Sequence, residues 1–181
     1  MEKIEITPVL DPMAFIKPST KTEVAPVLMP YPLGDDVPEA EWPKFLISPR
    51  TEARMDPVRK ASLDDKMPHK KMKALGFRTK TEDNLDGEKF TSNMIRAFVG
   101  GWSWLTLGLL KHILDPSRFL ARYKGEFAVA DSDAATVVPF NEQCLSLISL
   151  NANDDFRTFV INATGDTAAF FDAAREEQLG N

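Results

Sequence analysis

The chain has 181 residues, of which 43% are hydrophobic and 27% are charged, and its formal net charge is −5. These values are ordinary for a globular protein and exclude a wholly disordered chain, a collagen-like fibre and a disulfide scaffold. One cysteine and two histidines leave little material for a metal site, and the acidic balance argues against nucleic-acid binding by bulk electrostatics.

Proline is concentrated in the first part of the chain, where eleven of the thirteen prolines lie within residues 1–68. Because proline fixes φ and removes an amide donor, regular helices are not expected before about residue 50. Residues 1–43 also hold short apolar groups such as Val27-Leu28-Met29, too many for a purely flexible linker. We expect residues 1–43 to form an extended arm with one or two strands at most, lying on the protein's own surface or on a partner.

The N-terminus lacks a basic region followed by an apolar run, so no signal peptide is predicted. The lone Cys144 suits a reducing cytosol. The most apolar window, residues 97–110, is shorter than the roughly 18 residues of a membrane span, and we interpret it as buried core. We therefore expect a cytoplasmic protein that does not enter a membrane.

Charge is segregated along the chain. Residues 44–80 carry eleven basic and four acidic side chains, whereas residues 125–181 carry two and ten. The two regions can attract each other within one fold or between subunits, or one of them can form a partner-binding surface. The basic region has only Phe45 and Phe77 as aromatic residues, so a stacking platform for single-stranded nucleic acid is not indicated.

The middle of the chain predicts a strand over residues 44–48, ended by Pro49, and a short helix over residues 50–60 that Pro57 interrupts. Residues 66–78 are basic and form either a short helix or an ordered loop. The next segment is helical by its apolar spacing and is weakened or ended by Gly100-Gly101. Its apolar positions are Phe90, Met94, Ala97, Phe98 and Gly101.

A second apolar helix is predicted over residues 105–114, stopped at Asp115-Pro116, with one more helical turn over residues 117–123. The alternation of residues 126–130 indicates a strand, and residues 131–136 read as a polar turn.

The last third predicts two helices. Asn141 caps the first, over residues 142–150, and Asp154 or Asp155 caps a long second one that Gly165 can bend. The second has one buried face, formed by Phe156, Phe159, Val160, Ala163, Thr167, Phe170 and Ala174. We therefore predict a mainly α fold with a small β component (α+β), with the arm over residues 1–43 and a single mostly helical domain with a small sheet over residues 44–181.

Catalytic chemistry is not visible in the sequence. His69 and His112 stand in separate contexts, and the chain has no HExxH or CxxC spacing, no phosphate-binding glycine loop and no GxSxG element. Asp131-Ser132-Asp133 is explained by a polar turn. We therefore predict a protein that is not an enzyme and binds no metal or other cofactor.

Two tryptophans, Trp102 and Trp104, follow the glycine pair. They point to the same side of an extended chain and to nearly opposite sides of a helix. One is expected in the core, and the other is a candidate exposed anchor, since tryptophan is enriched at binding hot spots.

Four pieces of sequence then occur in order: the strand Lys44 to Ser48, a helix running into Phe98-Val-Gly-Gly-Trp102, Val138-Pro-Phe140 before a short helix, and Asp155-Phe-Arg-Thr-Phe159 opening a final helix. Together they resemble small tail assembly chaperones of tailed bacteriophages, over roughly residues 44–181. In that group the "V-x-G-W" and "V-P-F" elements are joined by a short turn, whereas here residues 103–137 lie between them.

The resemblance implies a role in the host cytoplasm: binding the tape-measure protein, or the tail-tube protein, during tail assembly. This role requires an apolar groove or helical face with a charged rim that accepts an amphipathic helix. The implied partner-binding residues are Phe98, Trp102, Trp104, Phe156 and Phe159. A plain core role is the alternative for Phe98, Trp102, Phe156 and Phe159, and self-association stays open.

The arm and the segregated charge also suit a structural protein of a phage virion or another large assembly, associated with tail, neck or capsid, in which the arm makes subunit contacts. Nucleic-acid binding through residues 44–80 is the weakest of the three hypotheses.

Overall fold

The computed structural model describes residues 24–35, 37–63 and 85–179, with side chains described up to residue 175. It is mainly helical with one small antiparallel sheet, which confirms the predicted fold class. In chain order the elements are β1 (Val27–Pro30), η2 (Glu39–Glu41), β2 (Lys44–Ile47), α1 (Glu52–Ala61), α3 (Gly87–Phe98), β3 (Val99–Ser103), α4 (Leu107–Leu110), α5 (Pro116–Tyr123), η4 (Asp131–Asp133), α6 (Glu142–Asn151), α7 (Asp154–Gly165) and α8 (Thr167–Leu179).

The sheet has the order β1-β2-β3, and the strand predicted over residues 44–48 is its central member, β2. On one side Met29 of β1 lies opposite Phe45, and on the other side Trp102 of β3 lies opposite the same residue. The second half of the expected arm thus belongs to the domain, because β1 pairs with β2 along its whole length. The first half, residues 1–23, lies outside the described residues.

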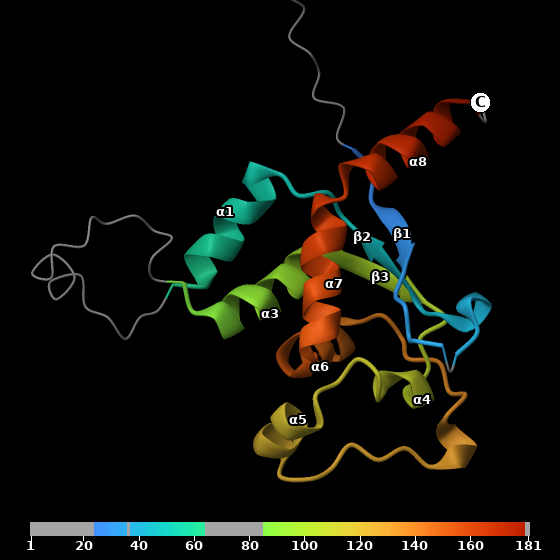
Figure 1. Cartoon of the computed structure of the whole chain (residues 1–181). Helices are drawn as coiled ribbons and strands as arrows, with labels where there is room; N and C mark the ends of the chain where they lie inside the picture. The colour runs from blue at the N-terminus through green and yellow to red at the C-terminus, as the bar shows by residue number, and fades with distance from the viewer. Residues whose placement is uncertain (1–23, 36, 64–84, 180–181) are drawn as a thin grey trace, which may run out of the picture.

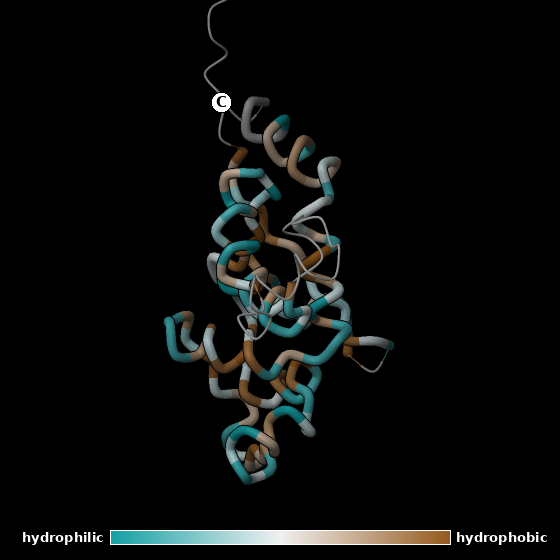
Figure 2. The backbone as a smooth tube through the Cα atoms, turned by 90° about the vertical axis from the view of Figure 1, so that its left-hand side faces the viewer, coloured by the Kyte–Doolittle hydropathy of each residue, from teal (hydrophilic) through white to brown (hydrophobic). Residues whose placement is uncertain are grey.

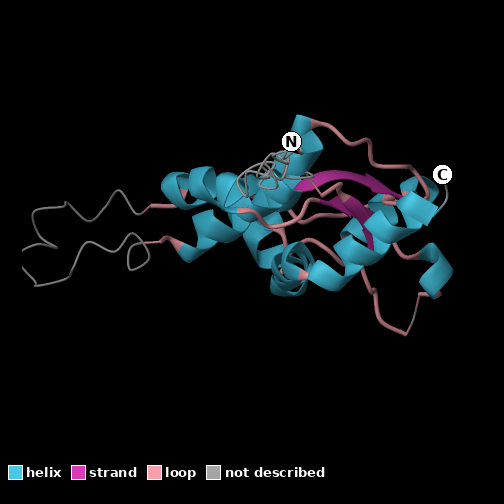
Figure 3. Cartoon of the chain, turned by 90° about the horizontal axis from the view of Figure 1, so that it is seen from above, coloured by secondary structure: helices cyan, strands magenta, loops and turns pink. Residues whose placement is uncertain are grey.

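Helix α1 and helix α3 pack side by side at one end of the molecule (Figure 3). Thr51 caps α1, and the helix continues through Pro57, so the predicted interruption is wrong. Pro57 is exposed, whereas Met55 and Val58 are buried against α3, and this burial offsets the missing helical hydrogen bond.

Helix α3 begins at the Asp86 cap and ends at Phe98, which confirms that the glycine pair stops it. Gly100 and Gly101 lie in β3 beside Leu46, whose side chain is the nearest neighbour of both. The low helix propensity of the two glycines disfavours continuing α3, and this part of the chain instead pairs with β2 through backbone hydrogen bonds.

The helix predicted over residues 105–114 is wrong in length, since only α4 is helical. Thr106 bridges Val137, and Leu114 bridges Ala152, so both ends of the segment pair with distant backbone instead of continuing a helix. Residues 126–130 form a loop and not the predicted strand. Residues 97–110, expected as a buried core segment, are divided among α3, β3 and α4.

The final helices follow the prediction more closely. Asn141 Oδ1 accepts a hydrogen bond from the Cys144 amide at 2.8 Å, as expected for the cap of α6. Asn153, not Asp154 or Asp155, caps the next helix. The predicted long helix is broken between Gly165 and Thr167 into α7 and α8.

The main core lies between the sheet and α7, with α6 and the 105–114 segment closing it below (Figure 1). In Figure 2 the hydrophobic segments run through the inside of this body and the hydrophilic ones cover the outer turns. Phe45, Phe156 and Ile113 are among its fully buried members. None of the helices in the described part of the chain is long and apolar enough to cross a membrane.

Candidate protein-binding groove

An open groove of about 1000 Å³ runs between β1 and α7 and reaches the start of α8. We call it the β1–α7 groove. One wall is formed by residues 27–34, and the other carries side chains of α7. The residues that line the groove opposite β1 are His112 from the turn after α4, and Asp155, Thr158, Phe159, Asn162, Ala163, Asp166 and Ala169 from α7, its C-terminal end and α8.

The α7 wall is one face of a helix. Its lining residues, from Asp155 to Asp166, recur at offsets of 3, 4, 7, 8 and 11 residues. This is the spacing with which one helix presents a stripe to another. Phe159 and Ala163 form the apolar middle of the stripe, whereas Thr158 and Asn162 are exposed beside it.

Aromatic rings form the floor where the two walls meet. Tyr31 follows β1 and packs edge-on against Phe45, Phe156 and Phe159, with ring centroids 6.3, 5.2 and 5.1 Å away. Such edge-to-face pairs add a specific geometry to the apolar burial. The floor is therefore held in one arrangement by contacts among four rings from β1, β2 and α7.

The Tyr31 side chain is only 5% exposed, yet its residue lines the groove. Burial, together with the nearby Asp155 carboxylate, raises the pKa of the Tyr31 phenol to about 12. No hydrogen bond joins its hydroxyl to the described residues. The phenol therefore stays neutral at physiological pH and can still donate or accept one hydrogen bond at the groove.

Carboxylates stand at both ends of the α7 wall. Asp155 lies in the first turn of α7 and Asp166 follows its last residue, and both are exposed. Asp166 also accepts a hydrogen bond from the Ala169 amide at 3.1 Å, which anchors the start of α8. The rim of the groove is thus negatively charged around an apolar middle.

The five residues implied by the family resemblance fall into different environments. Phe98 and Phe156 are fully buried, as the core alternative expects, and neither side chain reaches the surface in this structure. Phe98 packs in the cluster between α1 and α3, and Phe156 lies beneath the sheet. Phe159 lines the groove and is half-buried.

Trp102 and Trp104 differ in exposure, as expected for one packed and one exposed tryptophan. Trp102 is half-buried, and its indole N–H donates to the Val138 carbonyl at 2.8 Å. Trp104 is 68% exposed and has a positive φ of 63°. A bulky residue rarely adopts this backbone conformation, and strained positions cluster at functional sites.

Trp104, Val137 and Phe140 are exposed apolar side chains on two neighbouring chain segments, and we call them together the Trp104 surface. Two contacts hold the chain segments that carry them side by side. The Val138 amide donates to the Leu105 carbonyl, and the ring centroids of Phe140 and Trp102 are 4.7 Å apart. An apolar pocket of about 320 Å³ adjoins it, with Val137 in its wall.

Comparison of the chain with protein-family models, with curated proteins and with solved structures finds no match. The function is therefore inferred from the chain's own residues.

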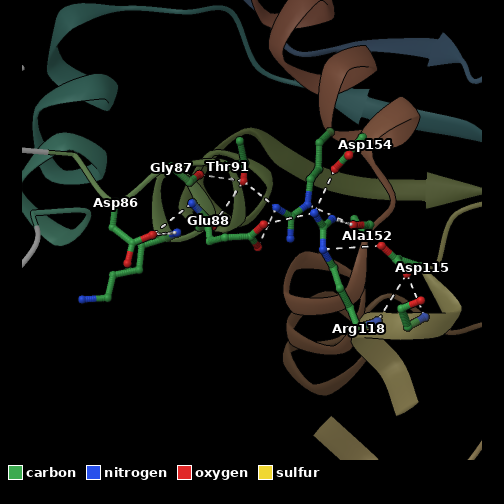
Figure 4. A network of polar contacts seen from close by, with 11 residues as sticks. Asp86, Gly87, Glu88, Thr91, Asp115, Arg118, Ala152 and Asp154 are labelled. Carbon is green, nitrogen blue, oxygen red and sulfur yellow. Dashed lines mark hydrogen bonds and ion pairs between the residues drawn. The ribbon is translucent and has the colours of Figure 1, made fainter. Parts of the chain in front are cut away.

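A polar network joins the start of α7 to α3 and α5 (Figure 4). Arg157 is 5% exposed and donates to Glu88 at 2.9 Å and to the Ala152 carbonyl at 2.9 Å. Arg118 donates to the same carbonyl, to Glu88 and to Asp154. These contacts join α3, α5 and α7, so the orientation of the groove wall depends on residues remote from it in sequence.

Sequence reasoning missed Tyr31 and the Arg157 network. The signal for Tyr31 was the alternation of Val27, Met29 and Tyr31, all of which pack on the core. The helical spacing of Asp155 to Asp166 is also visible in the sequence, but the pattern does not indicate which face of the helix is left uncovered by other elements. Asp131 and Asp133 form the short 3-10 helix η4 within the stretch predicted as a polar turn. Within the described residues no three His, Cys, Asp or Glu side chains come together as metal ligands.

Proposed function

We propose that this protein is a non-enzymatic assembly factor that binds a segment of another protein in the β1–α7 groove. The observation that carries the proposal is the groove itself, with an apolar middle and a negatively charged rim. Its aromatic floor is set by packing before any partner arrives, which lowers the cost of ordering on binding. An open groove of this length suits a chain segment better than an enclosed small molecule.

The more specific proposal is a bacteriophage tail assembly chaperone that binds the tape-measure protein, or the tail-tube protein, in the host cytoplasm. The short motifs around Trp102, Phe140 and Phe159 support this reading, since they resemble those of tail assembly chaperones. Phe159 is the motif residue that lines the groove, and Trp104 is proposed as a second contact on its own surface.

A structural protein of a phage virion is the second candidate. Two observations favour it: β1 is an edge strand supplied by the proline-rich segment, and the Trp104 surface leaves large apolar side chains exposed. Exposed apolar patches of this kind mark protein contacts. In this role the protein stays in the finished particle, whereas a chaperone leaves it.

Co-expression with the tape-measure protein of the same genome tests binding through the groove. We expect a soluble complex with the wild-type protein. Thr158→Lys with Asn162→Lys adds two cations to exposed positions of the α7 wall and is expected to weaken the complex at least about tenfold. The control, Ser117→Lys with Ala121→Lys, adds the same charges at the same spacing on the exposed side of α5. Equal effects of the two pairs would contradict a binding role for the groove.

Quantitative mass spectrometry of infected-cell lysate and purified particles separates the two roles. A chaperone is abundant in the lysate and missing from particles. A defined copy number in the particles contradicts the chaperone role and supports the virion role.

A further inference from the structure

We infer that the segment bound in the β1–α7 groove is an amphipathic helix with basic residues about eleven positions apart, and that it does not bind as a strand added to β1. This inference rests on the proposed function and specifies the partner's chemistry at the same site. It depends on two independent features, the hydrogen-bonding edge of β1 and the pattern on α7.

The outer edge of β1 is poor in amide donors. The Tyr31 amide donates to the Pro43 carbonyl at 2.9 Å, so this amide faces β2. Because amide direction alternates along a strand, Leu28 and Pro30 face the free edge, and Pro26 and Pro32 continue that register. Proline has no amide hydrogen, which leaves Leu28 as the donor among these four positions. Strand addition needs a row of donors and acceptors, and proline on an edge strand blocks it.

The opposite wall is built for a helix. Asp155 and Phe159 lie on one stripe of α7 that faces the groove, and Asp166, the first residue after the helix, continues this stripe. The two carboxylates are eleven residues apart, or about 16 Å along the axis, which is three helical turns. A partner helix laid along this stripe meets apolar residues in the middle and a carboxylate at each end.

Charge decides the chemistry of the partner. Both carboxylates at the ends of the α7 stripe are exposed, although one oxygen of Asp166 already accepts a hydrogen bond from the Ala169 amide. The Tyr31 hydroxyl near Asp155 supplies a further polar group at one end. Lysine or arginine eleven positions apart on the apolar face of a helix would meet both carboxylates at once, since eleven residues bring a helix back to nearly the same direction.

Three synthetic peptides of about twenty residues test the inference on the full-length protein. The first is an amphipathic helix with a leucine stripe and lysines eleven positions apart. The second carries glutamates in place of the lysines, and the third is the lysine peptide with two central prolines. We expect the lysine helix to bind, and the other two peptides to bind at least about tenfold more weakly, as measured by fluorescence anisotropy.

Matched variants locate the binding. Asp155→Asn with Asp166→Asn removes both rim charges and keeps an acceptor oxygen for the Ala169 amide. We expect it to weaken the lysine helix roughly tenfold. Asp131→Asn with Asp133→Asn removes two exposed charges from η4 and is expected to leave binding unchanged.

The inference is overturned if the proline peptide binds as tightly as the helix, if lysine and glutamate peptides bind alike, or if no peptide binds. These failures are separable from failure of the proposed function. If Thr158→Lys with Asn162→Lys still disrupts the tape-measure complex, the groove binds protein but not the helix inferred here. If those lysines leave the complex intact, the proposed function fails as well.

Discussion

The ring of Tyr31 lies edge-on to the ring of Phe159, with centroids 5.1 Å apart and planes inclined by 62°. This contact joins the end of β1 to the middle of α7 across the floor of the β1–α7 groove. Residues 128 positions apart in the sequence therefore meet at the floor of the groove.

Tyr31 predicts a loss of stability in alkaline solution. Its pKa is raised from 10.0 to about 12 in the folded protein, because burial and then the Asp155 charge disfavour the phenolate. The stabilisation is fully present below the unfolded pKa and is lost as pH rises from about 10 towards 12. By pH 11 wild type should lose about 1.4 kcal/mol more unfolding free energy than Tyr31→Phe, measured by denaturant titration.

The prediction would be contradicted if the unfolding free energies of wild type and Tyr31→Phe fell equally between pH 10 and pH 12. Tyrosinate absorbance offers an independent check, because the chain has only two tyrosines and Tyr31→Phe isolates the signal of one. Asp155→Asn should shift the Tyr31 transition to lower pH while burial still keeps its pKa raised.

Arg157→Ala should destabilise the protein by about 3 kcal/mol, measured as a shift in urea unfolding. The change removes a buried guanidinium that bonds Glu88, Thr91 and the Ala152 carbonyl. Arg157→Met keeps much of the side-chain volume, so it should lose less unfolding free energy than Arg157→Ala. Its loss measures the contribution of the polar contacts alone. Arg122→Ala, at an exposed position of α5, is the control and should change stability by less than about 0.5 kcal/mol. Equal losses at both arginines would contradict the account of the network.

Trp104→Gly should stabilise the folded state by about 1 kcal/mol. The backbone at Trp104 has φ of 63°, which glycine adopts without strain, and the lost side chain is largely exposed. Lys124→Gly provides a comparison at φ of 56°, with the same expected sign. If Trp104→Gly lowers the thermal midpoint while Lys124→Gly raises it, Trp104 contributes packing that its exposure does not suggest.

Pro57→Ala should raise the unfolding free energy by about 1–2 kcal/mol. Pro57 stands inside α1, where it lacks an amide donor, and its side chain is exposed, so alanine loses no burial. Circular dichroism and urea unfolding measure the effect. A destabilised variant would indicate that the proline's rigidity in the unfolded chain outweighs its cost in the helix.

The elements that the sequence predicted correctly are those with local signals. The strand around Phe45, the helix end at Gly100 and the Asn141 cap each depend on residues within a few positions. The helix expected over residues 105–114 failed because Thr106 pairs with Val137, a contact across thirty-one residues. No local pattern reports such a partner.

The candidate site was harder to predict than the fold. The sequence spacing predicts that Phe156 and Phe159 lie on one buried helix face. It does not show that Phe156 lies under the sheet while Phe159 reaches the groove. Both rings pack against Tyr31, which follows β1, and β1 is positioned by its pairing with the distant strand β2.

Hydrogen exchange of the full-length protein, with and without the tape-measure protein, tests the central claim most directly. We predict that binding slows amide exchange in residues 27–34 and 155–166, the two walls of the β1–α7 groove. Protection confined to the Trp104 surface, in segments 102–106 and 137–140, or no protection at all, would contradict it.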